Sequence, residues 1–203
     1  MTLPGAAGPG ASAPEGVRTR DPDRRERILR AAAELVSARG FHAVSMADIG
    51  AASGIVGSGV YRHFDSKSAV LLALLDEGMA RLLDGAAAAV GSGRPDAEVL
   101  EELVRDQVRF AVDESLLVRL WLREVRTLPD ADQRRLRRLQ RHYVEDWVHT
   151  LRELRPELAD GEARARVHVA IGAIQSAATW NAGVPRAELF ALLTECARRC
   201  LAA

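Results

Sequence analysis

Cysteines, long apolar runs and an excess of charge of one sign are all missing or scarce in this 203-residue sequence. Two cysteines exclude a disulfide-dense secreted scaffold and suit a reducing compartment. No apolar run reaches the roughly 18 residues of a membrane span, and the N-terminus lacks the apolar core of a signal peptide. We therefore expect a cytoplasmic protein with no membrane partner.

Sequence motifs of catalysis are missing as well. The chain has no Gly-rich phosphate loop followed by Lys, no nucleophile elbow, no HExxH and no paired-acid signature. We expect no catalytic residues and no cofactor. The formal net charge is zero, and residues 1–67 carry nine Lys and Arg against seven Asp and Glu, a net charge of +2. Any binding of nucleic acid must therefore come from oriented contacts and from a dimer more than from bulk charge.

The chain opens with residues 1–20, which are rich in Pro, Gly and Ala and offer almost nothing to bury. We expect a disordered arm. Arg18 and Arg20 would let it reach phosphates or a minor groove, and a solvated tail is the alternative. A first helix is expected from Asp21–Pro22 or Asp23, and Gly40 should end it.

Residues 45–67 (SMADIGAASGIVGSGVYRHFDSK) have the pattern of two short helices joined by a tight turn. Ser45 and Asp48 form a capping box at the start of the first helix. Gly54 is suited to ending it, because glycine adopts the left-handed conformation without a Cβ clash. A second short helix should follow and pack through Val60 and Phe64. This pattern predicts a helix-turn-helix, whose second helix enters the major groove of DNA.

These residues, together with residues 24–41 (RRERILRAAAELVSARGF), resemble the DNA-binding segment of the TetR/AcrR family of transcriptional regulators. The resemblance implies a three-helix DNA-binding domain at residues 21–67. A helical domain for effector binding and dimerisation would occupy residues 68–203. Double-stranded DNA, a second copy of the chain and a small-molecule effector of unknown identity are the partners it implies.

The resemblance also assigns roles to single residues. Ser45 and Tyr61 would donate hydroxyl hydrogen bonds to phosphate oxygens, and Lys67 would pair with a phosphate. Ser58 and Arg62 would lie near bases or the backbone. The alternatives are that Ser45 only caps its helix and that Tyr61 only wedges into the small core.

The sequence departs from the family pattern at the start of the second helix. The family usually carries Ser or Thr at the position of Val56 and often a basic residue at that of Gly57. Gly57 and Gly59 each lower helix propensity by about 1 kcal/mol relative to Ala, so we expect a short helix ordered by packing and by DNA. Val56 would meet a thymine methyl, and the glycines would bring backbone amides close to phosphate. His63 is a further candidate contact, with local packing as its alternative.

After Lys67 the chain consists of Leu-, Ala- and Arg-rich segments with apolar residues at helical spacing, and no strand-like alternation recurs. The sequence thus predicts an all-α fold. The last helices, at about 161–182 and 185–200, carry small and apolar residues that suit a dimer interface, with an intramolecular hairpin as the alternative. The residues expected at that interface are Ala170, Ala173, Ile174, Ala177, Ala178, Leu189, Leu192, Leu193 and Cys196.

The middle helices should enclose an effector pocket, although plain core packing explains the same residues. The candidate lining residues are Met79, Phe110, Leu117, Trp121, Tyr143 and Trp147. Their apolar character favours a lipophilic effector, and residues 120–156 resemble regulators of fatty-acid or sterol metabolism, which suggests an acyl-CoA. The arginines of residues 134–141 (Arg134, Arg135, Arg137, Arg138 and Arg141) would then pair with its phosphates, unless they form an ordinary solvated face.

Two further constellations favour simpler interpretations. His142, Asp146, His149 and Glu153 share a helix flank, which a polar surface explains without a metal, so we expect no metal site. Cys196 and Cys200 lie one turn apart and suit small packing residues better than a disulfide. A helical interaction protein that keeps the fold without operator binding is the alternative to a DNA-binding repressor.

Overall fold

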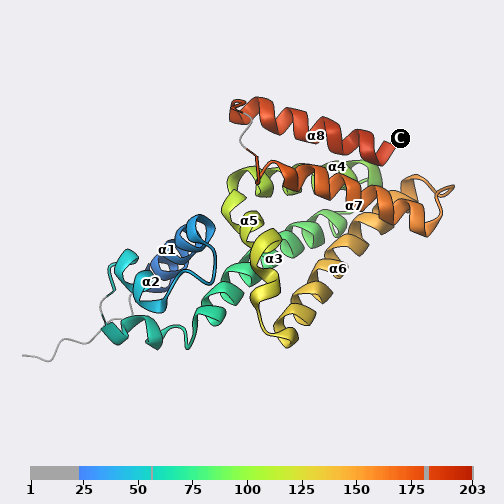
Figure 1. Cartoon of the computed structure of the whole chain (residues 1–203). Coiled ribbons are helices and arrows are strands. Elements are labelled where there is room, and N and C mark those ends of the chain that lie inside the picture. Colours follow the sequence, from blue (N-terminus) through green and yellow to red (C-terminus); the bar gives the residue numbers. More distant parts are fainter. Residues whose placement is uncertain (1–22, 56, 181–182, 203) are drawn as a thin grey trace, which may run out of the picture.

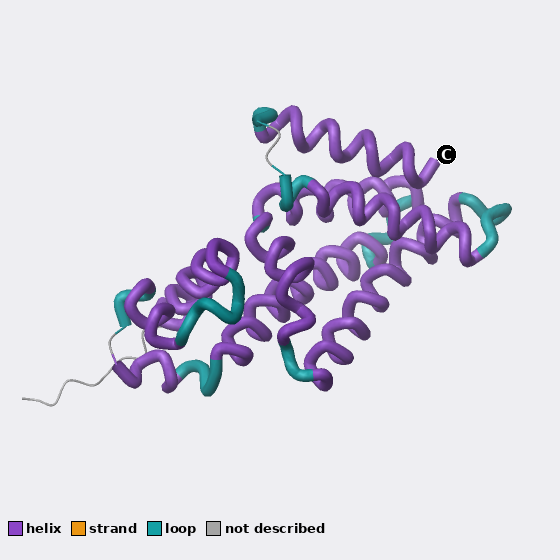
Figure 2. Tube along the Cα trace, in the orientation of Figure 1, coloured by secondary structure: helices purple, strands orange, loops and turns teal. Residues whose placement is uncertain are grey.

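The computed structural model describes residues 23–55, 57–180 and 183–202. Within these ranges the chain forms eight α-helices and two 3₁₀ helices, and no strand (Figure 1, Figure 2). The elements are α1 (Asp23–Arg39), α2 (Met46–Ala52), η1 (Gly57–Arg62), α3 (Lys67–Val90), α4 (Asp96–Asp113), α5 (Ser115–Glu124), η2 (Val125–Thr127), α6 (Asp130–Leu154), α7 (Asp160–Ser176) and α8 (Arg186–Ala202). The all-α prediction is confirmed. The predictions for residues 1–20, Asp21, Pro22 and Val56 lie outside the described residues.

The N-terminal head consists of α1, α2, η1 and the start of α3. Ile28 and Val36 of α1, Ile49 of α2 and Val60 of η1 are buried in one apolar cluster. Gly40 ends α1 with φ +82°, a conformation that L side chains rarely adopt. Short helices of this length are marginal alone, so the packing of this small core holds them in place.

The turn between α2 and η1 follows the expected chemistry, but the second helix does not. Gly54 has φ +69°, and the Ile55 amide donates to the Gly50 carbonyl at 2.9 Å. The second helix is a six-residue 3₁₀ helix, and Phe64 lies beyond its end. The expected short helix is present, but the sequence did not indicate its 3₁₀ form. Two glycines within six residues weaken the α-helix, and the tighter 3₁₀ form is common in such short pieces.

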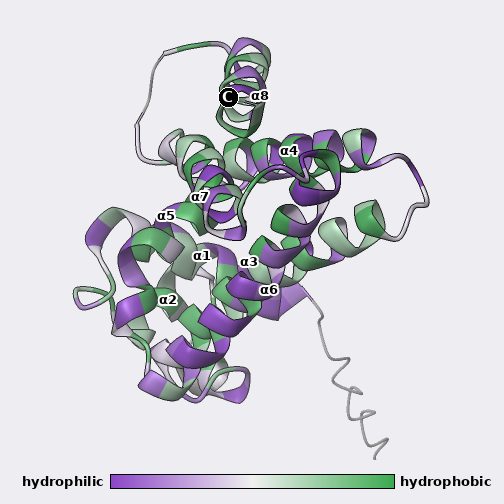
Figure 3. Ribbon diagram, turned by 90° about the vertical axis from the view of Figure 1, so that its right-hand side faces the viewer, coloured by the Kyte–Doolittle hydropathy of each residue, from purple (hydrophilic) through white to green (hydrophobic). Residues whose placement is uncertain are grey.

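The body is built on α3, a 24-residue helix that contacts α1 in the head and α4, α5 and α6 in the body (Figure 1). Helices α7 and α8 pack side by side at the far end from the head. Each labelled helix carries both hydrophobic and hydrophilic residues, as expected for one buried face (Figure 3). Helix α7 ends at Ser176, short of the expected residue 182. None of the described helices combines the length and apolar character that crossing a membrane requires.

Gly59→Ala tests the close packing within η1. A Cβ at position 59 would lie 2.6 Å from Cγ2 of the buried Ile55, which would have to move. We expect the free energy of unfolding, measured by urea denaturation, to fall by about 1–3 kcal/mol. In the control Gly161→Ala on α7, the added Cβ meets no atom within 4 Å, so stability should stay level or rise by up to about 1 kcal/mol. Equal effects of the two substitutions would contradict this account.

Candidate DNA-binding surface and ligand pocket

The first helix of the helix-turn-helix begins with a complete capping box. The Asp48 amide donates to Ser45 Oγ at 3.1 Å, and the Ser45 amide donates to Asp48 Oδ2 at 2.8 Å. Ser45 Oγ also donates to the same carboxylate at 2.6 Å. These hydrogen bonds from Ser45 lower the pKa of Asp48. The hydroxyl of Ser45 is thus occupied within the cap, and its contact with phosphate stays a prediction.

The exposed face of η1 carries polar and aromatic side chains, and its buried face packs on the core of the head. Val60 and Phe64 are buried in the core of the head. Tyr61 is 56% exposed, and Arg62 and His63 are exposed beside it. The predicted contact residues Gly57, Ser58 and Gly59 belong to the same helix. Tyr61, Arg62 and His63 are therefore free to meet a partner, as a DNA-reading helix requires.

Lys67 has an internal role that the sequence did not indicate. Its Nζ donates to the carbonyls of Phe41 and Val44 at 2.5 and 2.6 Å, and it lies 4.4 Å from the centroid of the Phe41 ring. These contacts fix the loop between α1 and α2 onto the start of α3. An ammonium group has three donors, so one N–H remains for the predicted phosphate contact.

The head is tied to the body through α5. Arg119 Nε donates to Ser37 Oγ of α1 at 3.1 Å, and its Nη1 donates to the Ala178 carbonyl, just beyond α7, at 3.0 Å. The Phe41 amide donates to Glu124 Oε1 at 3.4 Å. One helix thus connects the head to the C-terminal part of the body.

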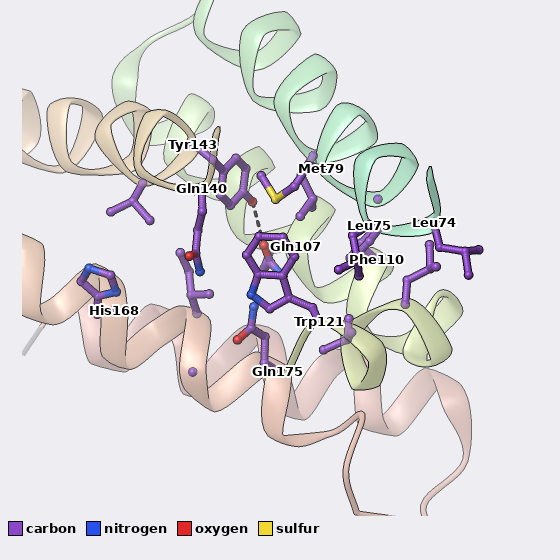
Figure 4. A pocket seen from close by; sticks show the side chains of 17 residues that line it. Leu74, Leu75, Met79, Gln107, Phe110, Trp121, Gln140, Tyr143, His168 and Gln175 are labelled. Atoms are coloured by element: carbon purple, nitrogen blue, oxygen red, sulfur yellow. Dashed lines mark hydrogen bonds between the residues drawn. The ribbon is translucent and has the colours of Figure 1, made fainter. Parts of the chain in front are cut away.

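The body contains a pocket walled by α3, α4, α5, α6 and α7 (Figure 4). It encloses about 720 Å³ of empty space, its open mouth included. Five predicted residues line it, namely Met79, Phe110, Leu117, Trp121 and Tyr143. Trp147 does not; it is fully buried and packs edge-on against Tyr143 with ring centroids 6.1 Å apart. The apolar face of α6 extends beyond the pocket, so helical spacing alone could not distinguish a residue that lines the pocket from one that packs in the core.

The sequence missed the polar side chains of the pocket. Gln107 is 1% exposed, and its Oε1 accepts a hydrogen bond from the Tyr143 hydroxyl at 2.8 Å. Burial raises the pKa of Tyr143, and the negative charges of Asp106 and Asp146 raise it further, so the hydroxyl stays protonated. Among the described residues, nothing accepts a hydrogen bond from Gln107 Nε2. The sequence did contain one signal of this polar site, because Gln107 interrupts a stripe of apolar residues.

The arginines of residues 134–141 do not line the pocket. Arg135 pairs with Asp76 of α3 at 2.5 Å, and Arg137 donates to Gln133. Arg134, Arg138 and Arg141 are exposed. This placement favours the solvated face over the proposed pairing with a bound phosphate.

The predicted dimer residues fall into two groups. Ala170, Ile174, Ala178 and Leu193 are buried in the core of their own subunit, so they offer a partner little or no surface. Periodicity identified an apolar face but not what covers it. Ala173, Ala177 and Leu189 are half-buried, while Leu192 and Cys196 are exposed. These five residues stay candidates for the interface.

The two remaining constellations show no special geometry. His149 Nδ1 lies 3.9 Å from Glu153 Oε1, and burial raises the pKa of Asp146. In the described part of the chain, no group of three or more His, Cys, Asp or Glu is arranged to hold a metal ion. Cys196 and Cys200 are both free thiols.

A helix-turn-helix head with an exposed second helix, carried on a helical body, defines a helix-turn-helix transcriptional regulator. Comparison with protein-family models identifies the family of regulators. Residues 28–74 match the model of bacterial regulatory proteins of the tetR family, and residues 93–182 match that of the tetracyclin repressor-like C-terminal domain. Together the two models cover more than half of the chain, and the protein belongs to the TetR family of transcriptional regulators.

Solved structures share the fold. A TetR-family regulator from Bordetella parapertussis 12822 has a TM-score of 0.78 at 23% identity, over 89% of this chain and 93% of that one. The ketosteroid regulator KstR2 of Mycobacterium tuberculosis has a TM-score of 0.76 at 20% identity, over 88% and 93%. AibR, solved with isovaleryl coenzyme A and operator DNA, has a TM-score of 0.73 at 20% identity, over 85% and 97%. No curated protein matches the sequence at a significant level.

Acid should weaken the cap of α2. Since the pKa of Asp48 is lowered in the folded state, its stabilisation is present at neutral pH and is lost as pH falls through that lowered value. We expect Asp48→Asn to melt below the wild type at about pH 7, with the gap narrowing toward about pH 3. Asp84→Asn, at an exposed position on α3, is the control and should show no such gap. A gap for Asp48→Asn that is independent of pH would disprove the role of the charge.

Proposed function

We propose that the protein is a transcriptional repressor that binds a pseudo-palindromic operator as a homodimer and is released by a small lipophilic effector. Two observations support the proposal. The helix-turn-helix has an exposed face, and α5, which is hydrogen-bonded to the head, also lines an apolar pocket. Action on chromosomal DNA places the protein in the cytoplasm.

DNA recognition is assigned to η1 and the cap of α2. Arg62 supplies a positive charge and Tyr61 a hydroxyl on the exposed face. With few side chains to reach bases, most contacts go to the phosphate backbone, and the dimer supplies register. Two heads on a two-fold axis meet half-sites about 34–36 Å apart, one turn of DNA.

Dimerisation is assigned to the outer face of α7 and α8. Val169 is 59% exposed and Leu192 is 53% exposed, and Trp180 beyond α7 is 73% exposed. Large apolar side chains left in water on one helical pair favour a protein interface. A second copy would extend the α7–α8 pair into a four-helix bundle.

We assign the release of the repressor from its operator to an effector that binds in the pocket. Its walls are largely apolar, which suits a lipophilic effector such as the acyl part of an acyl-CoA. The structural neighbour AibR was solved with an acyl-CoA and operator DNA, which supports this class of ligand without identifying it here. A ligand that displaces Trp121 or Leu117 moves α5, and Arg119 passes that displacement to α1.

The alternative function is a helical interaction protein that keeps the fold without operator binding. The six-residue 3₁₀ helix in place of an α-helical reader favours it. The two functions differ in whether the purified protein selects a DNA sequence.

Electrophoretic shift on genomic fragments, with salt titration, tests operator binding. We expect one selected fragment, bound with a steep loss of affinity as salt rises. Arg62→Ala should weaken binding and lower the salt slope by about one, and Tyr61→Ala should weaken all sequences alike. Arg138→Ala, at an exposed position of α6, is the matched control and should change nothing. A folded wild type that prefers no fragment would leave the interaction protein as the function.

Leu192→Glu tests the dimer face. A charge at this half-exposed leucine would be buried on association, so we expect a monomer by sedimentation velocity at micromolar concentration and weaker operator binding. Leu122→Glu is the control, because Leu122 is also exposed but lies on α5. A dimeric Leu192→Glu variant, or a monomeric wild type, would place the interface elsewhere or remove it.

A further inference from the structure

Gln107 presents a hydrogen-bond donor that the protein itself leaves without an acceptor. Its amide is almost completely buried and is oriented by the bond from the Tyr143 hydroxyl to its Oε1. With Oε1 held in this way, Nε2 is the group left over, and no described residue accepts from it. Leaving a buried donor unpaired costs free energy, so an acceptor at this point would be bound with selectivity.

The surroundings of this donor are apolar. Met79 of α3, Phe110 of α4 and Trp121 of α5 line the same pocket, and the close-up shows Gln107 and Tyr143 joined in the middle of it (Figure 4). The other amides, Gln140 and Gln175, and the imidazole of His168 lie on more exposed positions of α6 and α7. A ligand therefore meets one fixed donor at the buried end and further polar groups nearer to solvent.

Among its 17 described residues, the lining of the pocket offers no Asp, Glu, Lys or Arg to pair with an ionised group. Burying a carboxylate there would cost free energy, because no Lys or Arg in the described lining pairs with it. A cation at that end would likewise lose its hydration without an Asp or Glu in the described lining to pair with it.

We propose that the buried end of the pocket binds a neutral, lipophilic molecule through a carbonyl oxygen that accepts a hydrogen bond from Gln107 Nε2. Ketones, esters and thioesters share this chemistry, whereas hydrocarbons lack the acceptor and free fatty acids are negatively charged at neutral pH. The inference rests on the proposed effector pocket and names the ligand class and the residue that selects it.

Calorimetric titration of the DNA-free protein tests the selectivity. The probes are phenyl alkyl ketones from acetophenone to octanophenone, the alkylbenzenes of matching length and the matching phenylalkanoates. Each ketone differs from its alkylbenzene by one carbonyl in place of a methylene. We expect the best ketone to bind roughly five-fold or more tightly than its alkylbenzene, and the carboxylate to bind most weakly. Equal affinities, or no binding of any ketone, would overturn the proposal.

A double variant assigns the selectivity to Gln107. Gln107→Met combined with Tyr143→Phe removes both partners of one hydrogen bond, so neither is left without the other, and we expect the fold to be kept. We expect the ketone preference to fall below about two-fold while the alkylbenzene still binds. Gln175→Met, at a half-buried lining position, is the matched control and should keep the preference. A preference that survives the double variant would contradict the role of Gln107.

Titration with octanoyl-CoA distinguishes a thioester carbonyl from the carbonyl of a free ketone or ester. Binding that is lost in the double variant supports a thioester, and ketone binding without octanoyl-CoA binding supports a free ketone or ester. Octanoyl-CoA binding that the double variant leaves unchanged contradicts the proposed contact. Because no DNA is present, a failure of operator binding leaves these titrations unaffected and is read separately by electrophoretic shift.

Discussion

The guanidinium group of Arg119 links the head to the C-terminal part of the body. From the middle of α5 it donates to Ser37 in the head and to the Ala178 carbonyl just beyond α7, with Ser115 of its own helix 3.4 Å away. A guanidinium has five donors in a rigid plane, so it fixes the relative positions of groups that a lysine would leave loose. The head has only a small core of its own, so its contacts with α5 and with α3 hold its exposed helix in place.

The same helix serves the pocket, because a ten-residue helix presents different residues to different neighbours. Leu117, Val118 and Trp121 line the pocket, while Arg119 reaches the head. In the proposed mechanism, a ligand seated against Gln107 pushes on the pocket face of α5, and the helix moves as a unit. Coupling of this kind needs an element with two positions that both ligands bias, and α5, like α3, both lines the pocket and contacts the head.

Sequence reasoning succeeded where local chemistry fixes the backbone. The Ser45 cap and the positive φ of Gly54 depend on residues a few positions apart, so their signals are complete in the sequence. It failed where tertiary packing decides. Spacing places Ala170 on an apolar face, but only the fold shows that its own subunit covers that face. Gln107 was visible as a polar break in an apolar stripe, but only the fold brings it to Tyr143.

The most direct test is the loss of operator affinity that a bound phenyl alkyl ketone causes, measured in the wild type and in Arg119→Met by fluorescence anisotropy. The account predicts that saturating ketone weakens operator binding of the wild type by about ten-fold or more, within the usual range of allosteric coupling. In Arg119→Met, ketone affinity should be unchanged and the weakening should fall below about three-fold. An equal weakening in both proteins, at equal ketone affinity, would contradict transmission through Arg119.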